Sequence, residues 1–450
     1  NADLVDFCKS HGTDTRAVFP DAHAVILKLG GMVGEYVQMA RLAKKAGDEW
    51  MLANPGICSD AYGAIDEFKP DLLIYSFASS GPAIRYELQN GVPAVPVLFH
   101  RGSAELFESY LNMIPLRPSF LSTSPVVETK PTLSSSEPNA LHQTGPWRID
   151  DEINRTDSAS LLTFLAGSPA PVALGWGSML AKGQSPQDLL VLALRALLAS
   201  RRRGVIMGGW ARLDELGQNF VHNRCLEGLT KDEAEALANY AKTECCFVSS
   251  VPHSWLFPQC SCVVHHGGSG TTHATLLAGR PAVVTPIFFD QFHFSQAISH
   301  LGAGVGFTDA LPSISAEALA AAICDAEGMA PAAQRYARQM RAEIGVGGAA
   351  ACLQAFLKDE VVTGKWKYEW LQVQQRKAEE RKRCKVKAAA RTELQKAKEI
   401  AADSKKSQIE ASPSAKNDFM LAPRLSSHFP APMAHEFLAA PRLGLPTSFR

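Results

Sequence analysis

The feature that most constrains the fold is a run of six short apolar stretches that alternate with longer amphipathic segments between residues 165 and 345. Each stretch is rich in β-branched residues and too short for a buried helix, so it predicts a strand. An alternation of strands and helices of this length predicts a doubly wound parallel sheet, which binds its ligands at the carboxyl ends of the strands. The expected strands are 171–176, 204–209, 245–250, 261–266, 281–286 and 304–307.

A shorter alternation of the same kind occupies the first half of the chain. The segments 70–77 and 93–99 are expected as strands on either side of a helix over 81–91, which predicts a parallel βαβ unit. Two further helices are expected upstream, over 36–46 and 59–68. The segment 115–158 is rich in Pro, Ser and Thr, and we expect it to be a loop that connects two domains. These patterns place the domains at 1–158 and 159–360, followed by a tail over 361–450.

The distribution of charge separates the tail from the rest of the chain. The 450 residues include 45 basic and 45 acidic side chains, and this balance argues against a nucleic-acid partner. However, 14 of the basic and six of the acidic residues fall within 365–406, so the remainder carries a net charge of −8. We expect a basic helix over 365–406 and a disordered segment beyond it.

The basic helix has two interpretations. Its apolar positions recur with helical spacing, from Val386 to Leu394 and beyond, and Trp366, Tyr368 and Trp370 precede them. One hypothesis is peripheral contact with an anionic membrane. The other is a charged helix surrounded by solvent.

Cellular location and membrane insertion are constrained by three further features. No apolar run approaches the roughly 20 residues that a membrane-spanning helix needs. The ten cysteines show no regular spacing of the kind found in disulfide-rich scaffolds, which predicts a reducing, cytoplasmic setting. The chain opens at Asn1 without a charged and apolar leader, so we expect no signal peptide.

The strongest functional signal is the glycine-rich segment at 263–281, VVHHGGSGTTHATLLAGRP. A strand enters it, the chain is expected to turn at Gly267, Gly268, Ser269 and Gly270, and a helix is expected to begin at Thr271 or Thr272. Glycines let the backbone approach a ligand, and a helix amino terminus attracts anions, so the segment predicts a phosphate-binding loop. The alternative is a tight turn that needs glycine for its geometry alone.

Side chains near the other strand ends are candidates for the same site. Adjacent residues on a strand point to opposite faces, so His265 and His266 are not expected to bind one metal ion together. Ser178 follows the first strand of the run and can donate to a phosphate, or it serves an ordinary strand-end turn. Asp290 and Gln291 follow a later strand and can bind sugar hydroxyls, or they lie in a solvated loop.

The stretch from Val251 to Gln291 resembles the donor-binding signature of family 1 glycosyltransferases, above all the sterol 3-β-glucosyltransferase branch. Shorter matches include GWGSM at 175–179 and GGWARL at 208–213, and the resemblance extends over roughly residues 1–355. It implies the GT-B fold, in which two Rossmann-like domains face a cleft. The amino-terminal domain would bind the acceptor, and the carboxyl-terminal domain would bind the nucleotide sugar.

The resemblance also implies roles for individual residues. Two residues would lie along the nucleobase, six would hold the diphosphate, and two would contact the transferred hexose. The family more often has glycine before its sugar-binding aspartate, where this chain has Phe289. In that order, the residues are Val251 and His253; Ser178, His266, Gly268, Ser269, Gly270 and Thr271; and Asp290 and Gln291.

The family mechanism implies an inverting transfer without a metal or other cofactor, because helix amides, a histidine and hydroxyls stabilise the leaving diphosphate. In the family the general base lies in a turn that precedes the counterpart of DFCKSHG at 6–12, so we expect it upstream of Asn1 and assign no catalytic residue. The expected reaction moves a hexose from UDP-glucose to the hydroxyl of a sterol or similar lipid. The alternatives are a glycosyltransferase for macrolide or flavonoid natural products, and an inactive nucleotide-sugar-binding scaffold.

Overall fold

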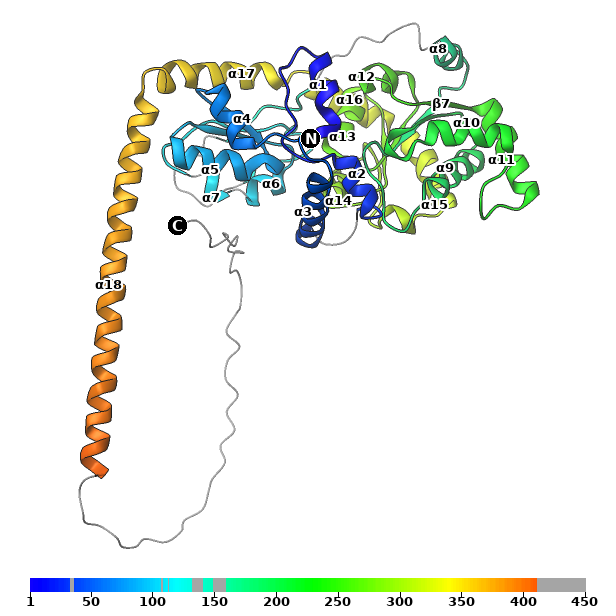
Figure 1. Cartoon of the computed structure of the whole chain (residues 1–450). Coiled ribbons are helices and arrows are strands. Elements are labelled where there is room, and N and C mark those ends of the chain that lie inside the picture. Colours follow the sequence, from blue (N-terminus) through cyan, green and yellow to red (C-terminus); the bar gives the residue numbers. More distant parts are fainter. Residues whose placement is uncertain (33–35, 107, 112, 132–140, 149–158, 411–450) are drawn as a thin grey trace. The chain divides into compact units, whose positions relative to one another are not determined.

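The computed structural model describes residues 1–32, 36–106, 108–111, 113–131, 141–148 and 159–410 (Figure 1). It divides into two compact units, of which the first is Asn1–Lys377 and the second begins at Ala378. The first unit contains two separate parallel sheets. The expected α/β class is therefore confirmed, whereas the tail expected beyond residue 410 lies outside the described residues.

The larger sheet has six strands in the order β10-β9-β8-β5-β6-β7, all parallel. The order reverses between β5 and β8, which makes this pair the switch point of a doubly wound sheet. All six predicted strands are confirmed, each within a few residues of its expected bounds. They are β5 (Val172–Gly175), β6 (Gly204–Met207), β7 (Cys245–Val248), β8 (Val263–His265), β9 (Ala282–Val284) and β10 (Gly304–Gly306).

Helices cover both faces of this sheet and bury its apolar strands. Ser185 caps α9, and its hydroxyl and the Asp188 carboxylate exchange hydrogen bonds with each other's backbone amides, as the sequence of this helix start favours. Leu190 and Leu194 of α9 are fully buried. The helices are α8 (Ala159–Leu165), α9 (Pro186–Ser200), α10 (Leu213–Asn223), α11 (Lys231–Glu244), α12 (His253–Leu256), α13 (Ser269–Leu277), α14 (Gln291–Leu301), α15 (Ala316–Glu327) and α16 (Ala330–Met340).

The smaller sheet has four parallel strands in the order β1-β2-β3-β4. The helix α5 (Ser80–Asn90) connects β1 to β2, so the predicted βαβ unit is confirmed. The prediction of a loop over 115–158 is wrong in part, because β3 and β4 lie within it. The strands are β1 (Leu73–Ser76), β2 (Ala94–Leu98), β3 (Ser119–Leu121) and β4 (Leu141–Gln143).

Six further helices lie in the described part of the first half of the chain, and two of them, α3 and α4, confirm the predictions over 36–46 and 59–68. The first of these, α3, continues to Ala53, several residues beyond its expected end. The helices of this part are α1 (Val5–Ser10), α2 (Ala22–Lys28), α3 (Tyr36–Ala53), α4 (Ala61–Phe68), α6 (Arg101–Leu106) and α7 (Glu108–Leu111).

The last two helices begin after the larger sheet but pack against the smaller one. In α17 (Gly345–Phe356), Ala349 is buried against Val95 and Phe120 of the four-stranded sheet. The first turns of α18 (Lys365–Glu410) bury Trp366 and Trp370, whose side chains are 2% and 8% exposed. The expected domain bounds at 158 and 360 stay a prediction. Helices that follow the larger sheet in the sequence complete the core of the smaller sheet.

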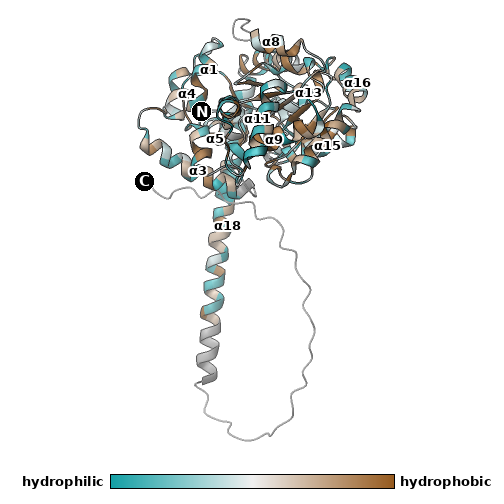
Figure 2. Ribbon diagram, turned by 90° about the vertical axis from the view of Figure 1, so that its right-hand side faces the viewer, coloured by the Kyte–Doolittle hydropathy of each residue, from teal (hydrophilic) through white to brown (hydrophobic). Residues whose placement is uncertain are grey.

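The basic helix is confirmed in α18, but its aromatic residues do not form a membrane-facing cluster. Two of the three aromatics are buried, and Tyr368 alone of them is exposed. Beyond Lys377 the helix exposes hydrophilic residues with isolated apolar ones such as Val386 and Leu394 (Figure 2). Among the described residues, no helix is both long enough and apolar enough to span a membrane.

Candidate functional site

The predicted phosphate-binding loop lies at the switch point, between the end of β8 and the start of α13. The helix begins at Ser269, two residues before its expected start. Its N-cap residue is Gly268, which has no side chain to accept a hydrogen bond from the first turn, and the earliest backbone bond closes from Thr272 N to Gly268 O. The amides at the start of α13 are therefore available to an anion, and the helix dipole favours one there.

The space around the three glycines of this loop differs, so packing requires glycine at some of these positions and not at others. Gly267 adopts a φ of +89°, and a Cβ atom there would lie 2.7 Å from Cγ1 of Val284. A Cβ atom on Gly268 would lie 2.5 Å from Nε2 of His266. Packing alone therefore explains these two glycines. A Cβ atom on Gly270 would meet no heavy atom within 4 Å, so packing does not explain the third.

The paired histidines differ in their contacts, as their strand geometry predicts. His265 is fully buried, and its Nδ1 accepts a hydrogen bond of 3.0 Å from the amide of Gly267, which fixes the turn. His266 is 9% exposed, and its buried Nδ1 has no partner in the part of the chain that the structure describes. Burial, with a smaller effect from His253, lowers the pKa of His266 to about 4. His266 is therefore a neutral hydrogen-bonding group at neutral pH rather than a cation.

The end of β5 lies beside this loop. Gly177 has a φ of +56°, and a Cβ atom there would lie 3.4 Å from Cε1 of His266, so the ends of β5 and β8 meet at this point. The carbonyl of Gly177 accepts a hydrogen bond of 2.9 Å from the amide of Trp210. Ser178 follows and is exposed at the same edge of the sheet, where its hydroxyl is accessible to a ligand.

The loop after β9 gives Asp290 and Gln291 different roles. Oε1 of Gln291 accepts hydrogen bonds from the amides of Ile287 (2.7 Å) and Phe288 (3.0 Å), so this oxygen holds the loop and does not serve a sugar hydroxyl. Burial raises the pKa of Asp290 to about 6. Phe289 has a φ of +53°, a conformation that glycine adopts without strain. This backbone conformation accounts for the glycine that the resembled family more often has there.

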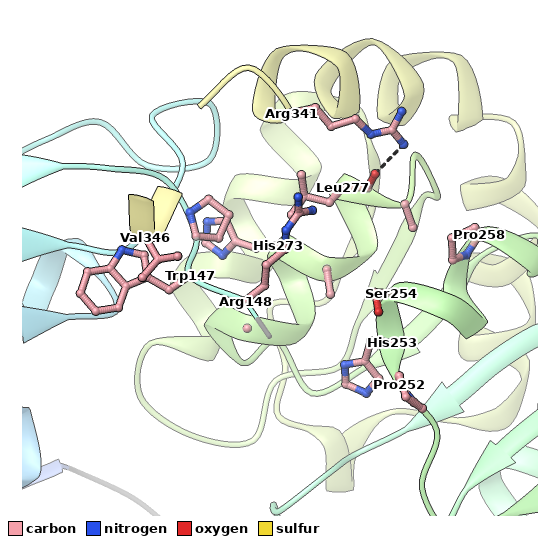
Figure 3. A pocket seen from close by; sticks show the side chains of 14 residues that line it. Trp147, Arg148, Pro252, His253, Ser254, Pro258, His273, Leu277, Arg341 and Val346 are labelled. Carbon is pink, nitrogen blue, oxygen red and sulfur yellow. Dashed lines mark hydrogen bonds between the residues drawn. The ribbon is translucent and has the colours of Figure 1, made fainter. Parts of the chain in front are cut away.

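A cavity of about 850 Å³ opens beside the start of α13. Figure 3 shows Trp147 and Val346 on one side of it and Pro252 and His253 on the other. Of the predicted site residues, His253 and Gly270 line this cavity. Val251 packs instead against the apolar core around Leu256 and Phe257.

The sequence interpretation missed the cationic residues of the cavity. Arg148 follows β4, within the segment predicted to be a loop, and Arg341 follows α16 and donates a hydrogen bond of 2.8 Å to the carbonyl of Leu277. These arginines are 193 positions apart in the sequence, so no local motif brings them together. Their charge gives the cavity wall a preference for anions.

Comparison with known proteins agrees with this geometry. Residues 229–347, which include the start of α13 and the loop after β9, match the family model "Erythromycin biosynthesis protein CIII-like, C-terminal domain". Vancomycin aglycone glucosyltransferase of Amycolatopsis orientalis is 32% identical over 235 residues. This part of the chain is therefore similar to a glycosyltransferase domain. A sterol 3-β-glucosyltransferase of Sclerotinia sclerotiorum is also 32% identical to this chain, over 170 residues.

The glycosyltransferase match covers part of each protein. The alignment with the vancomycin aglycone enzyme covers 52% of this chain and 50% of that relative, and the alignment with the sterol enzyme covers 37% and 11%. The chain thus spans about half or less of the length of these curated relatives. The solved structure of the spinosyn rhamnosyltransferase SpnG with thymidine diphosphate has a TM-score of 0.47 at 16% identity, covering 75% of this chain and 85% of that one.

Proposed function

We propose that this protein transfers a hexose from a nucleoside diphosphate sugar, with UDP-glucose as the donor, to the hydroxyl of a sterol or similar lipid. The observation that carries the proposal is the uncapped amino terminus of α13, which lies at the switch point and borders the cavity of about 850 Å³ through Gly270. A cavity of this size suits a nucleotide, and the exposed amides suit its diphosphate.

The proposed chemistry follows from where negative charge develops. When the acceptor hydroxyl attacks the anomeric carbon, its proton passes to a general base. The bond from that carbon to the diphosphate breaks, and its electrons pass to the β-phosphate oxygen. The dipole of α13, the first amides of that helix and the hydroxyls of Ser269 and Thr271 would stabilise this charge. His266 would contribute as a neutral hydrogen-bond partner, because its pKa is about 4.

The proposal includes no metal ion or other cofactor. The helix terminus and its hydroxyls supply the electrostatic stabilisation that a cation gives in other phosphate sites. Within the ranges that the structure describes, no three His, Cys, Asp or Glu side chains gather as metal ligands would. Donor binding that persists in excess EDTA would support this part of the proposal, and binding that EDTA abolishes and Mg²⁺ restores would refute it.

The acceptor has a second candidate. The alignment with the vancomycin aglycone enzyme covers 52% of this chain, and those with two fungal sterol 3-β-glucosyltransferases cover 49%, so a natural-product aglycone is supported about equally. The decisive assay compares transfer from radiolabelled UDP-glucose to cholesterol and to the vancomycin aglycone. We expect labelled steryl glucoside, and labelling of the aglycone alone would refute the sterol assignment.

Donor binding can be tested separately from transfer. Isothermal titration calorimetry of the full chain with UDP should show saturable binding. Replacing either His266 or Thr271 by alanine should weaken it by about 1 to 3 kcal/mol, the usual loss for a hydrogen bond to a charged group. Wild-type binding in both variants would mean that the diphosphate does not occupy this loop. UDP binding together with no transfer to any hydroxyl acceptor would favour the scaffold alternative.

We also propose peripheral membrane contact through α18, on the basis of its excess of basic residues. A variant that ends at Lys377 retains Trp366 and Trp370 in the core and removes the exposed basic stretch. Flotation with vesicles containing phosphatidylserine should fall in this variant relative to the full chain. Equal flotation of the two proteins would leave α18 as a solvated helix.

A further inference from the structure

The loop at 122–128, which follows β3 of the smaller sheet, is buried against the helices of the larger sheet. Ser124 is fully buried, and Glu128 is 3% exposed. Val127 lies in the same apolar cluster as Leu276 of α13 and Phe294 of α14. The two sheets of the first unit are therefore joined by a loop whose polar and apolar side chains are both inserted into the larger half.

Three polar contacts fix this loop to three different segments. The amide of Ser124 donates to Nε2 of His273 (3.0 Å), and its hydroxyl donates to Oε1 of Glu343 (2.5 Å). The carboxylate of Glu128 pairs with Nε2 of His293 at 2.8 Å. Buried polar groups are costly to leave unpaired, so these contacts favour one position of the loop over any shifted one.

His273 connects this loop to the proposed diphosphate site. Because Nε2 accepts from the amide of Ser124, the ring proton lies on Nδ1, which donates to the carbonyl of Ser269 (2.7 Å). Ser269 is the first residue of α13. The side chain of His273 is 1% exposed and also borders the cavity (Figure 3). One neutral imidazole thus bridges the smaller-sheet loop and the helix turn whose amides face the ligand.

We infer that His273 is a positioning residue that couples nucleotide binding at the start of α13 to the seating of the 122–128 loop. This inference rests on the proposed function, because it takes the ligand of α13 to be a nucleoside diphosphate. An anion on the first amides restrains Ser269, and the hydrogen bond from His273 transmits that restraint to the amide of Ser124. In return, a seated loop holds the first turn of α13 in the geometry that binds the ligand.

Three substitutions at this position separate the two hydrogen bonds. His273→Leu removes both of them. His273→Asn places an amide N–H near the position of Nδ1 and keeps the donor to Ser269. His273→Gln places an amide oxygen near the position of Nε2 and keeps the acceptor for Ser124. As a matched control, Ser124→Ala removes the hydroxyl that donates to Glu343 but keeps the backbone amide that donates a hydrogen bond to Nε2 of His273.

The measurements are UDP affinity by calorimetry and amide hydrogen exchange of the full chain with and without UDP. In the wild type and in Ser124→Ala, UDP should slow exchange over 122–128 as well as at the start of α13. In His273→Leu we expect UDP to bind roughly five- to tenfold more weakly, the loss of one to two ordinary hydrogen bonds. UDP should then no longer protect the loop. His273→Asn and His273→Gln each keep only one of the two bonds that carry the coupling, so both should lose the protection.

The possible outcomes separate this inference from the proposed function. Wild-type affinity and wild-type loop protection in His273→Leu would overturn the inference and leave the nucleotide site intact. No UDP binding to the wild-type chain would overturn the proposed function and the coupling together. If His273→Leu does not fold, the Asn and Gln variants decide, because wild-type loop protection in either of them would overturn the inference.

Discussion

Replacing Gly270 by aspartate should shift stability and nucleotide binding in opposite directions. Gly270 is the second residue of α13, and a Cβ atom there meets nothing within 4 Å, so the side chain fits without rearrangement. Aspartate has only a slightly higher helix propensity than glycine, so most of the gain comes from its carboxylate in the first turn, which adds about 0.3 to 1 kcal/mol. The variant should therefore unfold at a higher urea concentration than the wild type.

The same carboxylate should oppose the diphosphate. A like charge about 5 Å from the nearest phosphoryl group, at an effective dielectric constant of about 20, costs about 3 kcal/mol, which weakens binding more than a hundredfold. The loss should shrink as salt is added, because the repulsion is screened. Gly270→Ala is the matched control. It also removes the glycine but adds no charge, so any loss of affinity in it should not depend on salt.

The assays are urea unfolding followed by circular dichroism and UDP titration by calorimetry at two salt concentrations. A stable Gly270→Asp variant that binds UDP with wild-type affinity would refute the placement of the diphosphate at α13. A variant that loses both stability and binding would refute the reasoning about open space at Gly270. The expected pattern, higher stability with weaker and salt-dependent binding, cannot arise from misfolding.

Three further predictions concern other parts of the fold. Phe289 has a φ of +53°, so its glycine variant should be about 1 kcal/mol more stable to urea than its alanine variant. Both variants lose the ring, and only alanine keeps the backbone strain. Equal stabilities of the two variants would contradict this strain. The pKa of Asp290 is raised to about 6, so the carboxylate that would accept sugar hydroxyls is lost as pH falls through 6. The extra affinity of UDP-glucose over UDP should therefore diminish from pH 7 to pH 5, and a constant ratio would exclude Asp290 from the sugar site. Arg117 and Glu87 form a buried ion pair at 3.2 Å beside the smaller sheet. Arg117→Met should lower the free energy of unfolding by about 3 to 5 kcal/mol, and adding Glu87→Gln should restore part of it. An unchanged urea midpoint in Arg117→Met would show that the pair contributes nothing.

Local pattern was sufficient to predict the larger sheet. Most of its strands lie in apolar stretches such as 171–176 and 281–286, because helices cover both faces of a doubly wound sheet, and the strand ends carry glycine or polar residues. In the smaller sheet, β3 and β4 have three residues each and include Ser119, His142 and Gln143, so no apolar run marks them. Phe120 of β3 is buried partly by α17, which comes more than 220 residues later in the chain. No local pattern carries that information.

The candidate site was predictable where it depends on the backbone and unpredictable where it depends on tertiary contacts. The turn at Gly267, whose φ is +89°, follows from glycine, which is local. The helix itself begins at Ser269, two residues before its predicted start, without a capping side chain. The side-chain amide of Gln291 was assigned to a sugar, but its oxygen accepts hydrogen bonds from Ile287 and Phe288. Trp366 supported one of two hypotheses for the basic helix, contact with a membrane, but its side chain is buried in the core. Each residue has the chemistry that its predicted role needs, and only the packing shows that the side chain is already engaged.

The glycines of the phosphate-binding loop show how packing separates a structural residue from a functional one. Gly267 and Gly268 would clash with Val284 and His266 if they carried a side chain, so folding alone requires them. Gly270 has open space and lies in a helix, where glycine is unfavourable. Since folding gives no reason for glycine at this position, the explanation must come from what approaches it. That position borders the cavity, and a ligand whose phosphate groups contact the first amides of α13 would come close enough to exclude a Cβ atom.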